Sequence, residues 1–366
     1  MTDVMRTSDF SYTLPDELIA QHPLADRDES RLLVLTADAL RAEDRFFREL
    51  PELLRPGDLL VLNDSRVRPS RLLGQRPNGG AAEVFLLEPE SETDWVCLVR
   101  PGRRLRTGAT VNFAEHHLSA KIVTELPEGR RLVRFSHPTD VRGALAAAGQ
   151  VPLPPYIHEK LDDPERYQTV YARTSGSAAA PTAGLHFTTG LLERLAACGV
   201  EQTTLTLHVG LGTFRPVQTE RVEEHVMHSE HYEVSAATAE ALNRARRQGR
   251  RIVAVGTTSC RVLESIAARW DQGDGEFRAE RGETSIFIYP GFQFRVVDAL
   301  ITNFHLPQST LLMLVSAFAG RERVLAAYQH AIQARYRFYS FGDAMFLTRR
   351  PDPFPEENSD EPCRSL

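Results

Sequence analysis

The spacing of short apolar runs divides this chain of 366 residues into two kinds of sequence. Between about Arg68 and Ser136, short and partly alternating runs recur at near-regular intervals, separated by turns that contain Gly or Pro; they cover 81–87, 95–100, 109–113, 119–125 and 131–135. Such spacing is typical of a small all-β barrel or sandwich. A proline-rich connector, residues 151–156, follows and stiffens the return to the rest of the chain.

The remaining sequence mixes helix and strand patterns, which predicts the α/β class. Strands are expected over 32–35, 59–62, 203–209, 251–255, 286–289 and 296–302, and helices over 191–198, 238–248, 261–270, 311–318 and 321–335. We expect a main α/β domain from residues 1–67 and 151–350, an inserted all-β domain over 68–150, and a disordered acidic tail over 351–366.

Charge is uneven along the chain. The formal net charge of −6 argues against a polyanionic partner, but the first thirty residues contribute −5 and residues 351–366 contribute −4, which leaves +3 for the body. All but two of the 43 basic residues are arginine, which suits phosphate contact and which a GC-rich genome also explains. Four widely spaced cysteines and the lack of an export signal or long apolar run predict a cytoplasmic protein.

One strand-to-helix turn has the composition of a ligand site. Gly256, Thr257, Thr258 and Ser259 follow a buried-type strand, so a ligand can approach backbone N–H groups at a helix N-terminus. An ordinary N-capped turn explains the same residues. Cys260 is next in the chain, and a structural thiol is the simpler interpretation of it.

Two further loops combine glycines with a histidine. Residues 181–188 contain Gly184 and His186, and residues 208–214 contain His208 and Gly212. Small residues permit close backbone approach and histidine transfers protons near neutral pH, although tight turns with structural histidines fit equally well.

Other clusters have two interpretations each. His225, His228 and His231 have a spacing that weakly suggests a metal site, whereas His228 with Glu230 suggests a general acid and base. The aromatic residues of 336–343 suggest either base stacking or a core strand. The arginine run 244–251 suggests either an RNA contact or a solvated helix end.

Taken in order, these segments and several others resemble the S-adenosylmethionine:tRNA ribosyltransferase-isomerases of queuosine biosynthesis. The resemblance spans nearly the whole chain, and its blocks lie at 21–23, 27–33, 63–67, 171–173, 180–187, 207–214, 228–230, 256–261, 286–291, 303–313 and 336–345. Ala178 and His231 are small departures from the family pattern, and the acidic tail lies outside it.

The resemblance implies a fold and a reaction. The expected fold is a β-barrel-containing α/β main domain with a small inserted Greek-key barrel. The expected enzyme transfers the ribosyl part of S-adenosylmethionine to 7-aminomethyl-7-deazaguanine at the wobble position of tRNA, which gives epoxyqueuosine-tRNA, adenine and methionine. The expected partners are this tRNA and S-adenosylmethionine, with no metal, further cofactor or membrane, and the protein is expected to be a monomer.

Matching this chemistry to the blocks gives three groups of candidate residues. The proton-transfer candidates are His186, His208, His228 and Glu230. The candidates for holding S-adenosylmethionine are Gly184, Gly212, Gly256, Thr257, Thr258 and Ser259. The candidates for binding the tRNA or its modified base are Arg66, Arg261, Tyr336, Arg337, Tyr339 and Asp343.

Overall fold

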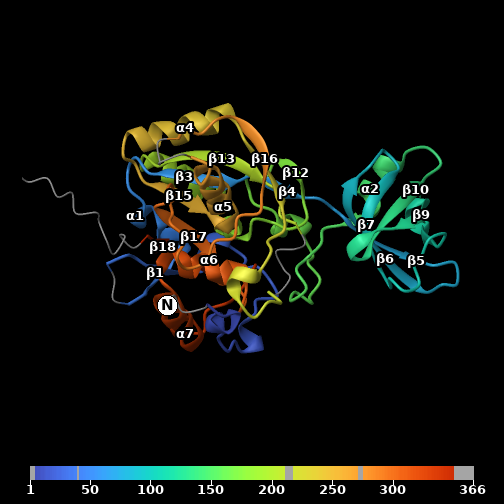
Figure 1. The fold of residues 1–366 in the computed structure, drawn as a ribbon, viewed down its shortest axis with the longest axis horizontal. Helices are drawn as coiled ribbons and strands as arrows, with labels where there is room; N and C mark the ends of the chain where they lie inside the picture. The colour runs from blue at the N-terminus through green and yellow to red at the C-terminus, as the bar shows by residue number, and fades with distance from the viewer. Residues whose placement is uncertain (1–4, 39–40, 211–216, 271–274, 350–366) are drawn as a thin grey trace, which may run out of the picture. The chain divides into compact units, whose positions relative to one another are not determined.

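The computed structural model describes residues 5–38, 41–210, 217–270 and 275–349 (Figure 1). They belong to two compact units. The main unit takes in Met1–Asn63, Thr182–Leu205 and Arg215–Leu366; the barrel unit takes in Asp64–Pro181 and Thr206–Phe214. The barrel unit thus contains the insert expected at 68–150 together with flanking segments.

The main unit is built on a nine-stranded mixed sheet with the order β16-β14-β13-β3-β15-β17-β18-β1-β2. The strands are β1 (Arg31–Leu35), β2 (Glu43–Phe46), β3 (Leu59–Asn63), β13 (Glu201–Leu207), β14 (Glu230–Val234), β15 (Ile252–Val255), β16 (Glu280–Thr284), β17 (Ala299–Asn303) and β18 (Ala344–Thr348). β13, β3, β15 and β17 run parallel. Every residue of β3, β15 and β17 is buried, as expected for central strands that are covered on both faces.

The helices of the main unit are α1 (Leu50–Leu53), α3 (Thr189–Ala197), α4 (Ala236–Arg247), α5 (Gly256–Ala267), α6 (Thr310–Ala319) and α7 (Arg321–Gln333). Side-chain oxygens of Thr188, Ser235 and Ser309 cap α3, α4 and α6. α5 has no side-chain cap. None of the helices in the described ranges is both long and apolar enough to cross a membrane.

Two sequence expectations about the main unit need correction. The helix expected from Arg261 begins at Gly256, so the Gly-Thr-Thr-Ser segment is its first turn and not a loop before it. The strand expected over 286–289 is absent; the strand here is β16, which ends at Thr284. The Thr284 hydroxyl accepts a hydrogen bond from the Ile286 amide (3.3 Å), which turns the chain away from the ladder.

The barrel unit contains a closed six-stranded barrel. Its strands are β5 (Arg71–Gln75), β6 (Ala81–Pro89), β7 (Asp94–Arg100), β8 (Thr110–Phe113), β9 (Leu118–Glu125) and β10 (Arg130–Ser136). They follow the order β5-β6-β7-β10-β9-β8, and Gln75 of β5 pairs with Asn112 of β8 to close the ring. Because β7 lies beside β10 and not beside β8, the connection is of the Greek-key type. The predicted fold class, α/β with a small all-β barrel, is confirmed.

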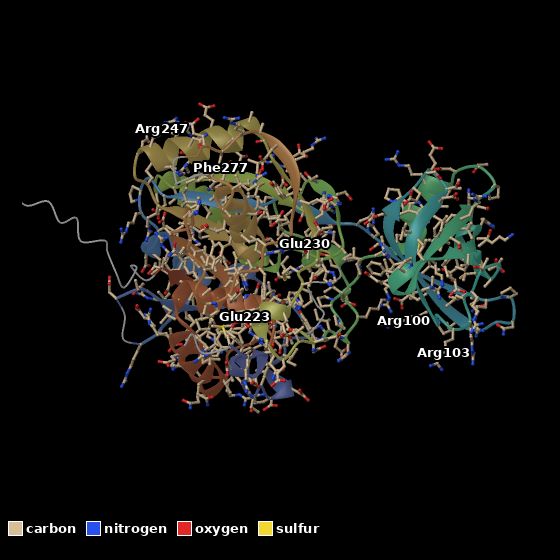
Figure 2. All side chains as sticks on the ribbon, in the orientation of Figure 1. Arg100, Arg103, Glu223, Glu230, Arg247 and Phe277 are labelled. Carbon is tan, nitrogen blue, oxygen red and sulfur yellow. The ribbon has the colours of Figure 1, made fainter. Side chains whose placement is uncertain are left out.

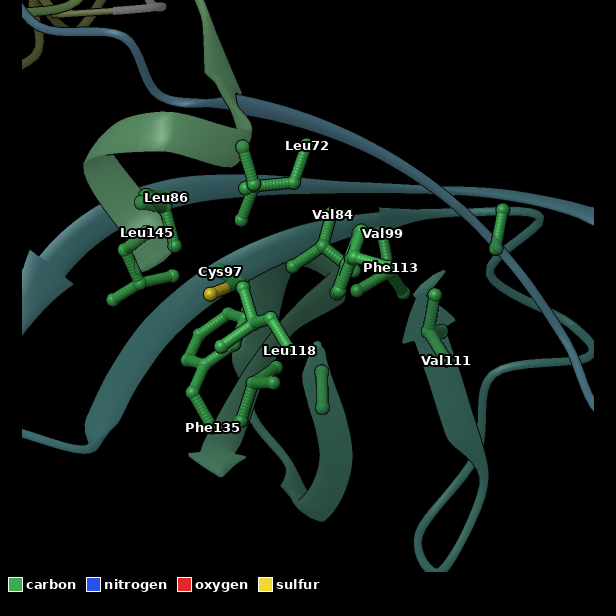
Figure 3. Packing of buried hydrophobic residues seen from close by; sticks show 14 of the residues in the cluster. Leu72, Val84, Leu86, Cys97, Val99, Val111, Phe113, Leu118, Phe135 and Leu145 are labelled. Carbon is green, nitrogen blue, oxygen red and sulfur yellow. The ribbon is translucent and has the colours of Figure 1, made fainter. Parts of the chain in front are cut away.

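Alternating side chains fill the inside of this barrel. Figure 3 shows the cluster, in which Leu72, Val84, Cys97 and Phe135 are almost completely buried. Gly74 is required where β5 meets β8, because a Cβ atom there would lie 2.7 Å from the Phe113 ring. The unit also contains α2 (Val141–Ala148), β11 (Gly149–Gln150) and the parallel pair β4 (Ser65–Val67) and β12 (Thr174–Ser177).

Candidate active site

Several strand ends of the main unit meet at one edge of its sheet. β3, β15 and β17 are parallel, so Asn63, Val255 and Asn303 lie at their carboxyl ends on the same edge. β18 runs antiparallel to β17 and parallel to β1, which brings the amino ends of β18 and β1 there, with Ala344 opposite both Asn303 and Leu32. We call this the carboxyl edge. In open α/β sheets, ligands bind at this edge.

His186 is held at the carboxyl edge by side chains from distant parts of the chain. It ends the short helix η8 (Thr182–His186), which contacts β17 and α5. Its Nδ1 lies 2.7 Å from Ser30 Oγ and its Nε2 lies 3.0 Å from Asn303 Nδ2. Its ring stacks on Phe47 with centroids 5.0 Å apart. Both ring nitrogens therefore have protein partners.

These contacts define the protonation state of His186. The Asn303 amide nitrogen can only donate, and it also donates to the Tyr339 carbonyl (3.1 Å), so Nε2 of His186 accepts and Nδ1 carries the proton. Burial, together with the positive charges of Arg337 and Arg27, lowers the pKa of His186 to about 3. A neutral ring with both nitrogens engaged is suited to positioning its neighbours more than to proton transfer.

The start of α5 packs against η8. Gly256 has φ +85°, and a Cβ atom there would lie 3.6 Å from Ala183 Cβ, so the position favours glycine and brings the two helices close together. Within the described residues, the buried Oγ1 of Thr258 and Oγ of Ser259 have no hydrogen-bond partner. The first turn of α5 thus offers free polar atoms next to Gly184 and the loop that contains it.

Cys260 is a structural residue of α5. Its side chain is fully buried, and burial together with Glu264 raises the pKa of its thiol. The structure thus favours the structural interpretation of this cysteine.

Glu230 and Arg261 form a buried ion pair. Glu230 begins β14 and Arg261 lies on α5, and both side chains are only 4% exposed. Nη1 of Arg261 donates to Glu230 Oε2, and its Nε donates to the Ile286 carbonyl (3.4 Å). Arg261 Nη2 is buried without a partner within the described part of the chain. His228, in contrast, is exposed.

The C-terminal aromatic segment packs into the core. Tyr336 is fully buried, donates to Asp44 Oδ1 (2.5 Å) and lies under the Arg31 guanidinium, 3.8 Å from the ring centroid. Tyr339 is 5% exposed. No ladder strand forms over these residues before β18, so the segment is core but not a strand. A base can stack on Tyr336 only if this packing opens.

Asp343 connects the same segment to the carboxyl edge through hydrogen bonds. Its two carboxylate oxygens accept from the backbone amides of Arg31 (2.9 Å) and Arg337 (2.7 Å). Burial raises the pKa of Asp343. Nη2 of Arg337 donates a hydrogen bond to the His22 carbonyl, whereas the buried Nη1 of Arg337 has no partner among the described residues.

Three candidates lie elsewhere in the chain. Arg66 belongs to the barrel unit and forms an ion pair with Glu165. His208 also belongs to the barrel unit, where its ring packs closely on Gly176. Gly212 lies outside the described residues.

The weaker alternatives from the sequence can also be placed. No group of three or more His, Cys, Asp or Glu side chains in the described ranges is arranged to hold a metal ion. The arginines of the run 244–251 are largely neutralised: Arg244 and Arg250 pair with Glu201, and Arg251 pairs with Asp58. The arginines of this run therefore form ion pairs within the main unit.

Sequence reasoning missed the residues that hold His186. Ser30 and Asn303 lie within two of the resembling blocks; Ser30 directly precedes β1 and Asn303 is the last residue of β17, both at the carboxyl edge. Their position at strand ends was the only available signal, because the histidine that they contact is 156 and 117 residues away in sequence.

Comparison with known proteins agrees with this architecture. The family model described as "Queuosine biosynthesis protein" matches residues 7–347. An S-adenosylmethionine:tRNA ribosyltransferase-isomerase from Desulfitobacterium hafniense is 54% identical over 94% of this chain and 100% of its own length. A crystal structure of an S-adenosylmethionine tRNA ribosyltransferase from Thermotoga maritima, 42% identical, covers 93% of this chain and 100% of its own with a TM-score of 0.54. The resemblance found in the motifs is confirmed, and the chain belongs to the queuosine biosynthesis protein family.

Proposed function

We propose that this protein is an S-adenosylmethionine:tRNA ribosyltransferase-isomerase that binds S-adenosylmethionine at the carboxyl edge of the main unit. Its proposed second substrate is tRNA with 7-aminomethyl-7-deazaguanine at the wobble position, and its products are epoxyqueuosine-tRNA, adenine and methionine. Family membership and the 54% identity to a relative of that name support the activity. We further propose that it acts as a cytoplasmic monomer.

One observation supports the placement of the substrate. Buried polar atoms without a protein partner are rare in folded proteins, and each calls for an explanation. At the carboxyl edge they include Thr258 Oγ1, Ser259 Oγ and Asn303 Oδ1, and Arg337 Nη1 lies on the adjoining segment. Hydroxyls, an amide oxygen and a guanidinium suit the ribose hydroxyls, the adenine amino group and the carboxylate of S-adenosylmethionine.

The chemistry demands a base and a neutral nucleophile. The sulfonium acidifies hydrogens on the ribose 5′ carbon, so removal of one of them starts the loss of adenine. The aminomethyl group of the tRNA base must be neutral when it attacks. Because His186 uses both ring nitrogens within the protein, we assign it to positioning Asn303. Because Glu230 is paired with Arg261, the exposed His228 remains the proposed proton carrier among the candidates of the main unit.

The direct test is adenine release. The protein is incubated with S-adenosylmethionine and tRNA that contains the aminomethyl base, in the presence of EDTA, and free adenine is measured by chromatography. We expect one adenine per modified tRNA, and none with tRNA that lacks the aminomethyl base. Binding of tRNA without adenine release would instead support a non-catalytic RNA-binding protein.

A matched pair of variants tests the placement. Thr258→Val removes a free hydroxyl at the start of α5 at constant shape, and loss of one ligand hydrogen bond should raise the KM for S-adenosylmethionine about 2- to 10-fold. The control is Ser316→Ala, which removes a buried and equally unpartnered hydroxyl within α6. Equal KM values in both variants would place S-adenosylmethionine elsewhere.

A further inference from the structure

The barrel unit presents a loop of unpaired arginines. It connects β7 to β8 and contains Arg100, Arg103, Arg104 and Arg106, all exposed; Arg100 and Arg103 are labelled in Figure 2. Within the described part of the chain, none of these four side chains forms an ion pair (N···O within 4.0 Å) or a side-chain hydrogen bond. We call residues 100–106 the arginine loop. Four cations in seven residues without counter-charges are available for an external anion.

The surrounding acids are already engaged. Glu83 stands opposite Arg100 in the β6–β7 ladder, but its carboxylate pairs with Arg71 (3.1 Å). Glu125 pairs with Arg131 (3.1 Å). This differs from the arginine run of the main unit, where Glu201 and Asp58 neutralise the basic side chains. The positive charge of the arginine loop is therefore not neutralised, whereas that of the run 244–251 largely is.

The backbone of the loop is anchored to the barrel. Leu105, near the end of the loop, is fully buried in the barrel core, whereas Arg104 and Arg106 on either side of it are exposed. The amides of Arg104 and Leu105 donate to the Pro101 carbonyl (3.1 and 3.2 Å), and Arg131 Nε donates to the Leu105 carbonyl (3.2 Å). A preformed surface of this kind loses little conformational entropy when it binds.

A further cation lies next to the loop. Lys121 of β9 is exposed and pairs in register with Thr110, the first residue of β8 after the loop. The exposed loop residues other than arginine include Pro101, Thr107 and Gly108, so the surface has no large apolar side chain to dock a protein partner. Guanidinium groups without apolar neighbours match a run of phosphates best.

We propose that the arginine loop, with Lys121, is a docking surface for the phosphate backbone of the tRNA substrate. The inference deepens the proposed function and rests on it for the identity of the RNA. It gives the inserted barrel a role in substrate binding that is separate from the chemistry at the carboxyl edge. Contacts to phosphates fix the position of an RNA without reading its sequence.

The test is the salt dependence of tRNA binding. The triple variant Arg103→Gln, Arg104→Gln, Arg106→Gln should bind tRNA about 10- to 100-fold more weakly near 0.15 M salt, and the slope of log Kd against log salt should fall by about 2 to 3. The KM for S-adenosylmethionine should not change. Fluorescence anisotropy with labelled tRNA measures the first two quantities, and thermal unfolding confirms that the exposed substitutions leave the fold intact.

The control removes the same charge from paired arginines. Arg134→Gln, Arg247→Gln, Arg281→Gln lowers the net charge equally, but these side chains pair with Asp94, Glu276 and Glu233. We expect nearly normal binding in this control. Equal loss of affinity in both triple variants would mean that total charge controls binding and would overturn the inference, as would normal binding by the loop variant. Adenine release by the wild type reports separately on the proposed function.

Discussion

Acid should destabilise this protein through its buried histidines, and His186 allows the effect to be isolated. The pKa of His186 is about 3 in the folded protein and about 6.5 in an unfolded chain. Between these values the unfolded state binds one more proton than the folded state, so stability is present above pH 6.5 and is lost as the pH falls. At pH 5.0 the loss relative to neutral pH is about 1.5 × 1.36, or about 2 kcal/mol.

The perturbation is His186→Gln, whose amide can donate to Ser30 and accept from Asn303 but does not titrate. Urea unfolding of the wild type and the variant at pH 7.5 and 5.0 gives four free energies. Burial also lowers the pKa of His305 to about 3. Because both proteins contain His305 and the same carboxyl groups, the contributions of these groups cancel when the wild type and the variant are compared. The variant should lose about 2 kcal/mol less than the wild type over this pH range.

A control histidine completes the experiment. His22→Gln makes the same substitution at an exposed histidine and serves as the reference for the effect of the substitution itself. If His186→Gln and the wild type lost the same free energy between pH 7.5 and 5.0, His186 would not be held neutral in the folded protein. The assignment of its proton to Nδ1 and its positioning role would then both be refuted.

Three further predictions concern the buried ion pair, the start of α5 and the acidic tail. Glu230→Gln should lower the free energy of urea unfolding by about 3–5 kcal/mol, because it leaves the Arg261 charge buried and uncompensated. The double variant Glu230→Leu, Arg261→Met should recover much of this stability, and a double variant no more stable than Glu230→Gln would contradict the reasoning. Gly256→Ala should cost about 1–2 kcal/mol for its positive φ and raise the KM for S-adenosylmethionine; unchanged thermal unfolding and KM would argue against close packing of α5 on η8. Deletion of residues 351–366 should leave the Kd for tRNA unchanged, and weaker binding would assign the acidic tail a role.

The sequence was informative where one physical signal dominated. The runs at 59–62 and 252–255 are recognisable as strands because they are buried on both faces and contain only apolar side chains. The barrel strands were recognised from alternation and turn residues. The start of α5 was misplaced because this helix has no side-chain cap and begins at a glycine with positive φ. A glycine followed by three hydroxyl residues has the sequence pattern of a turn.

Only some residues of the candidate site could be predicted from the sequence. His186 and Gly256 were found because small residues and a histidine are conspicuous in a loop. Ser30 and Asn303 were not, because a single sequence does not record which distant residues share a hydrogen bond. The burial of Tyr336 was likewise undecided, since aromatic residues have the same local pattern in a core and on an RNA-binding surface.

The pairing of β1 with β18 has a consequence for how the protein is made. β1 is among the first strands to leave the ribosome, yet its parallel partner starts at Ala344, near the end of the described chain. The strands of the barrel pair with near neighbours in sequence, so this unit can fold while synthesis continues. The main sheet must wait for its last strand, and because β18 also brings Asp343 to the carboxyl edge, no incomplete chain has a finished candidate site.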